Sequence, residues 1–187
     1  MKNSTLRVGV IGPTNVELIE SLVPLTPGTL ESAARRMGAF LAQNSMGLVS
    51  VPDRGVGFWV LEGYRSSGGE NSLALSPTGA DTFDNCKDVT PRHVSMANQV
   101  RTDLSWEEAP AQMAREVNCF VCLGLSCGTI IELAWTKWIR RIPVFAVESF
   151  ITGLPIEVMS ELDVRLSSNI DETEKLLLEL ANDIDKS

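Results

Sequence analysis

Three short and almost uninterrupted apolar runs constrain the fold of this chain more than any other feature. They cover residues 6–12 (LRVGVIG), 119–125 (CFVCLGL) and 142–147 (IPVFAV). Runs of this length without polar alternation are typical of parallel strands that are buried on both faces of a sheet. Segments with helical spacing separate the runs. We therefore predict a doubly wound parallel sheet with helices on both faces, a three-layer α/β/α arrangement.

Weaker segments extend the same alternation along the chain. The further predicted strands are 47–51, 71–77 and 162–168, with another candidate at His93–Ala97. The predicted helices are 29–44, 55–69, one within 105–117, 129–141, and a last one capped by Asp171 and Glu174. Ser105 with Glu108 resembles a capping box at the start of the third of these helices. Because 187 residues suffice for one sizeable core and no internal repeat is visible, we expect one domain over residues 1–187.

The net charge narrows the range of partners. It is −8, with an isoelectric point of about 4.7, whereas binding to a duplex needs a concentrated basic patch. We therefore expect no partner of the duplex nucleic acid class. A small anion stays compatible with this charge, because backbone N–H groups and one or two arginines can hold it.

The remaining composition points to a reduced, aqueous compartment. No apolar run approaches the ~20 residues that span a membrane, and the apolar segment near the N-terminus is too short for a signal peptide. We expect no membrane partner and a cytoplasmic location, with the four cysteines as thiols. Cys119 and Cys122 form a CxxC, but a strand points them to opposite faces. His93 is the single histidine, so we expect no metal site and no cofactor.

Three glycine-containing turns each follow a predicted strand. They are residues 12–15 (GPTN), 53–57 (DRGVG) and 124–129 (GLSCGT). In a doubly wound sheet these turns meet at one edge. There, glycines let a backbone approach a ligand, and helix N-termini favour an anion. The sequence therefore predicts a phosphate or nucleotide pocket, although the dinucleotide GxGxxG, the Walker A motif and the GxSxG elbow are all missing.

Glu132 lies one turn inside the helix that follows the third turn. Two interpretations stay open: a carboxylate that is favoured there by the helix dipole, or a group that contacts a ribose or acts as a general acid–base. Trp135 and Trp138 follow along one side of the same helix. We interpret them as core or subunit-interface residues rather than as a surface on which a base stacks.

The order of these segments resembles the LOG family. The residues that carry the resemblance are VGVIGP at 8–13, LALSP at 73–77, GLSCGTIIELAW at 124–135 and IPVFAV at 142–147. Members of this family, once labelled possible lysine decarboxylases, are Rossmann-like and belong to a wider group that includes the DNA-processing protein DprA. The active ones are phosphoribohydrolases, which release a base from a nucleoside 5′-monophosphate. The resemblance therefore implies such a ligand, a catalytic role for Glu132, and pairing into dimers.

The chain departs from the family signature PGGxGTxxE and from an upstream GGxxGxM. Gly128, Thr129 and Glu132 match the first motif, whereas Leu125 stands where a glycine allows close approach to a phosphate. In the second motif Asp53 and Arg54 replace the two glycines, and Arg54 is expected to compensate in charge. The arginine that active members carry on the preceding helix falls near Ala109, with Arg101 and Arg115 the nearest arginines.

The resulting site prediction has Glu132 as the catalytic residue. The predicted phosphate- or nucleotide-binding residues are Gly12, Pro13, Thr14, Arg54, Gly55, Gly57, Ser126, Cys127, Gly128 and Thr129. Gly128 and Thr129 are expected to supply N–H groups at the helix N-terminus. Three functions stay open: a nucleotide-binding protein that has lost hydrolysis, an active phosphoribohydrolase, and a structural oligomer with a vestigial pocket. The expected partners are a small phosphorylated nucleoside and a second copy of the chain, as a homodimer.

Overall fold

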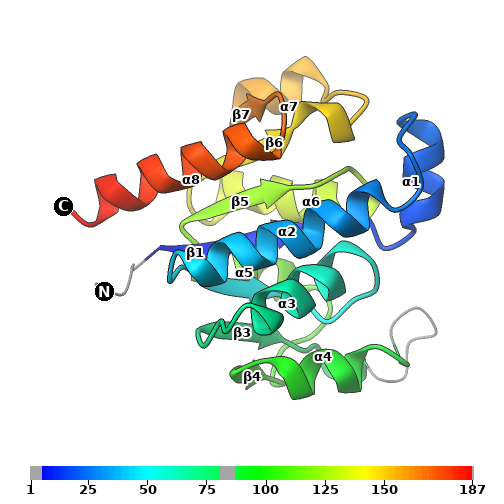
Figure 1. Cartoon of the computed structure of the whole chain (residues 1–187), viewed down its shortest axis with the longest axis vertical. Coiled ribbons are helices and arrows are strands. Elements are labelled where there is room, and N and C mark those ends of the chain that lie inside the picture. The colour runs from blue at the N-terminus through cyan, green and yellow to red at the C-terminus, as the bar shows by residue number, and fades with distance from the viewer. Residues whose placement is uncertain (1–5, 81–86, 187) are drawn as a thin grey trace.

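The computed structural model describes residues 6–80 and 87–186. Its centre is a seven-stranded sheet with the order β4-β3-β2-β1-β5-β6-β7 (Figure 1). Every pair of neighbouring strands is parallel. This confirms the predicted fold class, a Rossmann-like three-layer α/β/α arrangement. The strands are β1 Arg7–Ile11, β2 Gly47–Ser50, β3 Ser72–Leu75, β4 Gln99–Arg101, β5 Cys119–Cys122, β6 Pro143–Val147 and β7 Asp163–Ser167.

The strand order reverses at β1. From β1 the chain builds outward through β2, β3 and β4, and then returns to place β5 on the other side of β1. Val8 of β1 is thus paired with Leu48 of β2 and with Cys119 of β5. The carboxyl ends of β1 and β5 therefore enclose the switch point, where ligands bind in open sheets of this kind.

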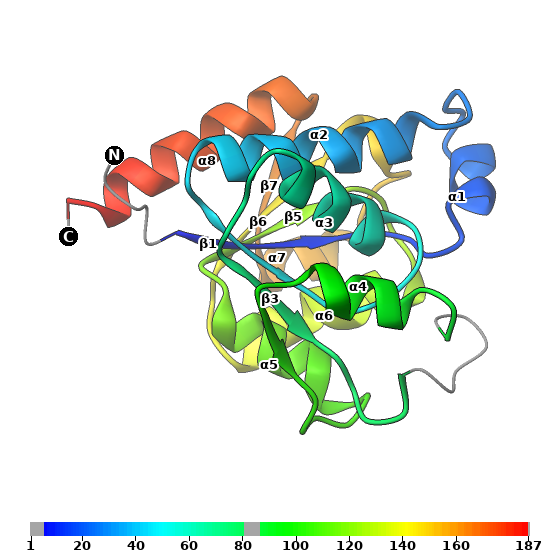
Figure 2. The ribbon, with the colours of Figure 1, turned by 60° about the horizontal axis from the view of Figure 1, so that its bottom comes forward.

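Helices cover both faces of the sheet, as Figure 2 shows with α2 and α8 above it and α5 and α6 below. The helices are α1 Val16–Leu22, α2 Thr29–Gln43, α3 Val56–Ser66, α4 Thr90–Met96, α5 Glu108–Glu116, α6 Cys127–Trp138, α7 Ile156–Glu161 and α8 Ile170–Ile184. A short 3₁₀ turn, Glu148–Phe150, follows β6. Among the described residues, no helix has the length and the apolar character that crossing a membrane requires.

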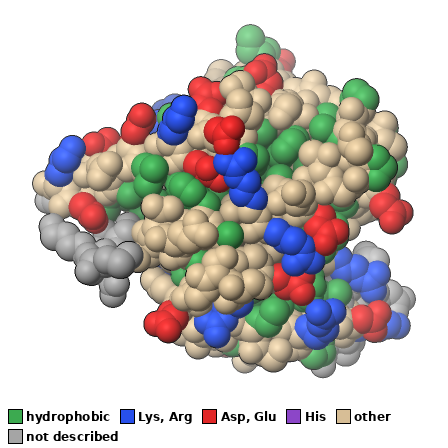
Figure 3. All heavy atoms as spheres, in the orientation of Figure 1, with side chains coloured by type: hydrophobic (Ala, Val, Ile, Leu, Met, Phe, Trp, Pro, Cys, Tyr) green, Lys and Arg blue, Asp and Glu red, His purple; other side chains and the backbone are tan. Residues whose placement is uncertain are grey.

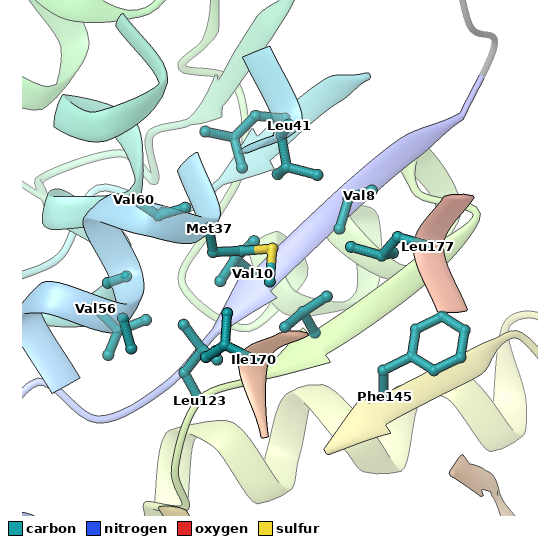
Figure 4. Close-up of a cluster of buried hydrophobic side chains, with 14 of the residues drawn as sticks. Val8, Val10, Met37, Leu41, Val56, Val60, Leu123, Phe145, Ile170 and Leu177 are labelled. Atoms are coloured by element: carbon teal, nitrogen blue, oxygen red, sulfur yellow. The ribbon is translucent and has the colours of Figure 1, made fainter. Parts of the chain in front are cut away.

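Two hydrophobic cores lie on opposite faces of the sheet. In the first, Met37 of α2, Val60 of α3 and Leu177 of α8 meet the side chains of β1 (Figure 4). The second joins α5 and α6 to the other face. Cys119 belongs to the first core and Cys122 to the second, so the two thiols point apart as predicted. Cys86 lies outside the described residues.

Helices α2 and α3 approach each other at two glycines. A Cβ added to Gly38 would lie 2.0 Å from the carbonyl oxygen of Val60, and one added to Gly63 would lie 2.1 Å from that of Arg35. Both contacts are with backbone, which cannot move aside as a flexible side chain would. The absence of a side chain at these two positions therefore allows the two helices to pack at this separation. The outer surface of this layer carries acidic and basic side chains interspersed (Figure 3).

Some local predictions were wrong. The candidate strand His93–Ala97 is mostly helix, because Pro91 occupies the first turn of α4, where its fixed φ suits a helix. The last helix is capped by Asn169, whose side chain accepts from the N–H of Glu172 at 3.0 Å, rather than by Asp171. Helices α1 and α7 were not predicted.

The predicted capping box before α5 is present. The Ser105 N–H donates to Glu108 Oε2 at 2.8 Å, and the Glu108 N–H donates to Ser105 Oγ at 3.3 Å. This reciprocal pair orders the entry into α5. It holds the segment that carries Trp106 and Glu107 at the edge of the sheet.

Candidate functional site

A cavity of about 610 Å³ opens at the carboxyl ends of β1 and β2, where α5 and α6 begin. It is lined by Val10, Ile11, Gly12, Thr14, Val51, Asp53, Arg54, Gly57, Trp106, Glu107, Pro110, Met113, Ser126, Cys127, Gly128, Thr129, Ile131, Glu132 and Trp135. Nine of the eleven residues in the site prediction are among them. The three glycine-containing turns therefore reach one cavity, next to the switch point of the sheet.

The two predicted residues that do not line the cavity hold its turns together. Gly55 has φ +68°, and a Cβ there would lie 2.4 Å from the carbonyl oxygen of Pro13. That oxygen also accepts from the N–H of Val56 at 3.3 Å. The first and second turns are thus in direct backbone contact. Pro13 and Gly55 shape the site in this structure without facing the cavity.

The N-terminus of α6 presents backbone N–H groups to the cavity. Ser126 is the N-cap, with extended backbone, and its Oγ accepts from the Thr129 N–H at 3.2 Å. Thr129 Oγ1 lies 2.9 Å from the same Ser126 Oγ, and Thr129 is buried. The N–H of Thr129 is therefore engaged within the cap, which corrects the expectation that it faces a phosphate. Helix geometry gives the N–H groups of Cys127 and Gly128 no acceptor inside the helix, and both residues are exposed.

Leu125 directly precedes the N-cap of this helix. Its side chain packs against the second core and is not among those that line the cavity. The preceding Gly124 has φ +115°, a conformation that a residue with a Cβ rarely adopts. The backbone turns at Gly124, and the half-buried Leu125 that follows lies against the core.

Arg54 lines the cavity and already has an acidic neighbour. Its guanidinium lies 3.1 Å from Asp88 Oδ2, and 45% of its side chain is exposed. Its backbone N–H donates to Asp53 Oδ1 at 2.7 Å. An anion in the cavity would compete with Asp88 for this guanidinium.

Glu132 and Asp53 form a pair of carboxyl groups in the cavity, one from α6 and one from the second turn. Burial, with a smaller contribution from the charge of Asp53, raises the pKa of Glu132 to about 8. Burial also raises the pKa of Asp53 to about 6, opposed by the N–H and the charge of Arg54. At pH 7 Glu132 therefore carries its proton while most of Asp53 is ionised. The sequence had indicated Asp53 merely as a replacement for a family glycine.

Sequence reasoning also missed the aromatic part of the cavity. Trp106 precedes α5, and Trp135 lies two turns into α6. Both line the cavity, and Trp135 also packs against the second core. Trp138 has the opposite environment, with 73% of its surface exposed and Lys137 Nζ 5.0 Å from its ring centre. Trp135 and Trp138 therefore lie in different environments on α6, although the sequence analysis had treated them as one group.

His93 lies outside the cavity lining. It is fully buried, and its Nε2 lies 2.8 Å from Ser50 Oγ. Burial lowers its pKa to about 3, so the ring is neutral at physiological pH. In the part of the chain that the structure describes, no group of three or more His, Cys, Asp and Glu side chains is arranged to hold a metal ion.

Comparison with known proteins supports the fold. No family model matches the chain, and no curated protein matches it in sequence. Among solved structures, TM1055, a structural genomics target, is similar with a TM-score of 0.70 and 16% identity over 94% of this chain and 99% of the other. A molybdenum cofactor carrier protein from Chlamydomonas reinhardtii has a TM-score of 0.67 and 18% identity, over 93% and 98%. At these identities the likeness establishes the Rossmann-like fold.

A third similar structure corrects the expected partners. DNA processing protein A from Helicobacter pylori, which has a single-stranded DNA binding mode, matches with a TM-score of 0.67 and 16% identity, over 95% of this chain and 82% of the other. The sequence-based expectation named a small phosphorylated nucleoside and a second copy of the chain, and set duplex nucleic acid aside because of the acidic charge. That list of partners is wrong because it leaves out single-stranded nucleic acid, which a protein of this fold binds.

Proposed function

We propose that the cavity binds a nucleoside 5′-monophosphate or a closely related phosphorylated nucleoside. The observation that carries this proposal is the meeting of the three predicted turns at one cavity, with the N-terminus of α6 at its mouth. The phosphate binds to the N–H groups of Cys127 and Gly128, where the helix dipole favours an anion. Arg54 adds a positive charge to the lining of the same cavity.

The spacing along α6 supports a ligand of this type. Gly128 and Glu132 are four residues apart, which is a rise of about 6 Å. A sugar attached to a phosphate at Gly128 therefore reaches the level of Glu132, where Asp53 also lies. The two carboxyl groups offer both a donor and acceptors for the ribose hydroxyls.

We also propose that the chain is a divergent relative of the LOG family. Its segment order and its fold support this, and its altered glycine motifs set it apart.

Cys127 allows a sharp test of the phosphate site. It is the first residue of α6 and follows an extended Ser126, a position at which proline is well tolerated. Cys127→Pro therefore removes one N–H donor while keeping the helix, and Cys127→Ala keeps the donor as a matched control. We expect Cys127→Pro to weaken AMP binding in calorimetry by about tenfold or more, as for a lost charge-assisted hydrogen bond of ~1.5–3 kcal/mol. Equal affinity of the two variants would contradict this phosphate site.

A second function, hydrolysis of the N-glycosidic bond, is favoured by the protonation of the carboxyl pair. Glu132 donates its proton to the leaving nitrogen of the base, while ionised Asp53 accepts a proton from the water that attacks C1′. The C1′–N bond breaks and a C1′–O bond forms, giving ribose 5-phosphate and the free base. The proton taken up by Asp53 then restores Glu132.

Chromatographic detection of free base from AMP, GMP, CMP and UMP tests this second function. Glu132→Gln is expected to abolish the release of base while AMP binding is retained. Glu179→Gln, a change at an exposed position on α8, is the control and keeps full activity. Binding without any base release in the parent protein leaves a nucleotide-binding protein, and full activity in Glu132→Gln would refute the catalytic assignment.

A further inference from the structure

The single histidine of the chain is a buried titratable group that the proposed chemistry leaves unused. His93 is fully buried on α4, and its Nε2 lies 2.8 Å from Oγ of Ser50, the last residue of β2. Among the residues that the structure describes, its Nδ1 has no hydrogen-bond partner, and neither has Oγ1 of the buried Thr90 on the same side of α4. Buried polar atoms without partners are costly, and an apolar side chain here would avoid that cost. Folded chains keep such costs chiefly at functional sites.

The hydrogen bond to Ser50 ties α4 to the turn that carries Asp53. Ser50 ends β2, and Asp53 follows shortly after it, in the lining of the cavity. On the other side of this turn, the His93 ring lies against Phe58, near the start of α3, with the ring centres 6.4 Å apart. One buried side chain therefore contacts both flanks of the second turn, the strand before it and the helix after it.

Two charged neighbours of His93 reach the same segment from the surface. The guanidinium of Arg92 lies 4.9 Å from the ring centre of Phe58, and Asp88 lies 3.1 Å from the guanidinium of Arg54. The side chains of Asp88 and Arg92 are 70% and 68% exposed, so water and salt weaken these contacts. The bond between His93 and Ser50 is buried, which makes it the strongest of these links.

The protonation of Asp53 depends on where this turn lies. Burial raises the pKa of Asp53 to about 6, and the N–H and the charge of Arg54 oppose this rise. The other titratable side chains in the lining of the cavity are Arg54, Glu107, Cys127 and Glu132. A turn that moved outward would expose the Asp53 carboxyl group to water and bring its pKa back toward the ordinary value.

We propose that His93 is a positioning residue, which fixes the second turn through Ser50 and so keeps Asp53 buried in the cavity with Glu132. The proposal rests on the proposed function in one respect, because hydrolysis is the reaction that uses Asp53 as the proton acceptor. Histidine suits this role. Since burial lowers the pKa of His93 to about 3, the ring stays neutral while Asp53 titrates, and the hydrogen bond to Ser50 persists.

Carbon-13 NMR titration of the aspartate side chains, in the full chain without ligand, tests this role. Ser50→Ala removes one oxygen atom and adds no bulk. We expect the pKa of Asp53 to fall from about 6 to about 5 or below in this variant, toward its ordinary 3.8. His93→Gln, whose amide can bond to Ser50, should stay closer to the parent. Ser50→Cys, with a weaker hydrogen-bonding group of similar size, should show a smaller fall and replaces Ser50→Ala if that variant does not fold.

Tyr64→Phe is the matched control. It removes a buried hydrogen bond of 2.9 Å from the Tyr64 hydroxyl to the carbonyl oxygen of Met46, at the opposite end of β2. The pKa of Asp53 should stay within about 0.3 of the parent value in this variant, because the lost bond is distant from the second turn. An unchanged pKa of Asp53 in Ser50→Ala would overturn the proposal and leave His93 as a core residue. A fall of equal size in Tyr64→Phe would overturn it too, because any loss of stability would then loosen the turn.

The release of base from AMP gives a second measurement. Asp53 must be ionised to accept a proton, so the acid limb of kcat against pH should move to lower pH in Ser50→Ala, by the same amount as the pKa. The value of kcat at its optimum should fall as well, because the carboxylate is less well placed. Absence of base release in the parent would refute hydrolysis alone, and the titration without ligand would still decide the role of His93.

Discussion

Replacing Glu132 by Gln should make the protein more stable at alkaline pH. Burial and the charge of Asp53 raise the pKa of Glu132 from its ordinary 4.5 to about 8. A carboxyl group with a raised pKa in the folded state contributes stability that is fully present below pH 4.5 and is lost as the pH rises toward 8. Gln has nearly the same shape and no ionisation, so the variant does not undergo this loss.

The magnitude follows from the shift in pKa. A shift from 4.5 to about 8 corresponds to roughly 5 kcal/mol of unfolding free energy at pH 9. Glu132 keeps part of its surface exposed in the cavity, so solvent reduces the effect, and we expect Glu132→Gln to be more stable by about 2–3 kcal/mol at pH 9. At pH 5 the difference in unfolding free energy should be under about 1 kcal/mol, because this pH lies close to the pKa of the group in the unfolded chain.

Urea unfolding of the parent and the variant at pH 5, 7 and 9 measures this difference directly. Glu179→Gln, at an exposed position, is the control and should remain within about 0.5 kcal/mol of the parent at each pH. His93 and Asp53 are present in both proteins, so their titration largely cancels from the comparison. A variant that is no more stable than the parent at pH 9 would show that Glu132 is well hydrated, and would refute its protonated state at neutral pH.

Three further predictions concern other residues. Arg54→Ala should weaken AMP binding by about tenfold in calorimetry, near the lower end of a charge-assisted contact because Asp88 competes for the guanidinium; unchanged affinity would mean that the arginine serves Asp88 alone. Gly38→Ala should lower the unfolding free energy by about 2–3 kcal/mol, since its Cβ meets the backbone of α3 at 2.0 Å, whereas Gly128→Ala, with its nearest neighbour at 3.8 Å, should stay within about 1 kcal/mol. Burial lowers the pKa of His93 to about 3, whereas the unfolded chain takes up a proton near pH 6.5. The unfolding free energy of the parent should therefore fall by about 2 kcal/mol between pH 8 and pH 5. A His93→Gln variant with the same acid dependence would contradict this.

The sequence made the central layers predictable because burial on both faces leaves a distinct pattern. The runs that became β1, β5 and β6 have no polar alternation, and α2 repeats its apolar residues at helical spacing. Short peripheral helices do not leave such a pattern. Helix α7 buries none of its side chains deeply, and α4 has seven residues, of which His93–Met96 alternate in a way that also suits a strand.

The parts of the candidate site that the local backbone determines were predictable from the sequence. The parts that tertiary packing determines were missed. Glycine turns after strands located Gly12, Gly57 and Gly128 at the cavity. Trp106 reaches the cavity through the position of α5 relative to α6, which no local pattern describes. Asp53 was overlooked because the family resemblance directed attention to the glycine that it replaces. The hydrogen bond from the Thr129 N–H to Ser126 Oγ depends on a side-chain rotamer, so the sequence did not predict it either.

A crystal structure of the protein with AMP would test the central claim most directly. The account predicts the phosphate within about 2.7–3.2 Å of the backbone nitrogens of Cys127 and Gly128, and the ribose beside Glu132 and Asp53. An empty cavity at a saturating concentration of AMP, or a phosphate held elsewhere on the protein, would contradict it.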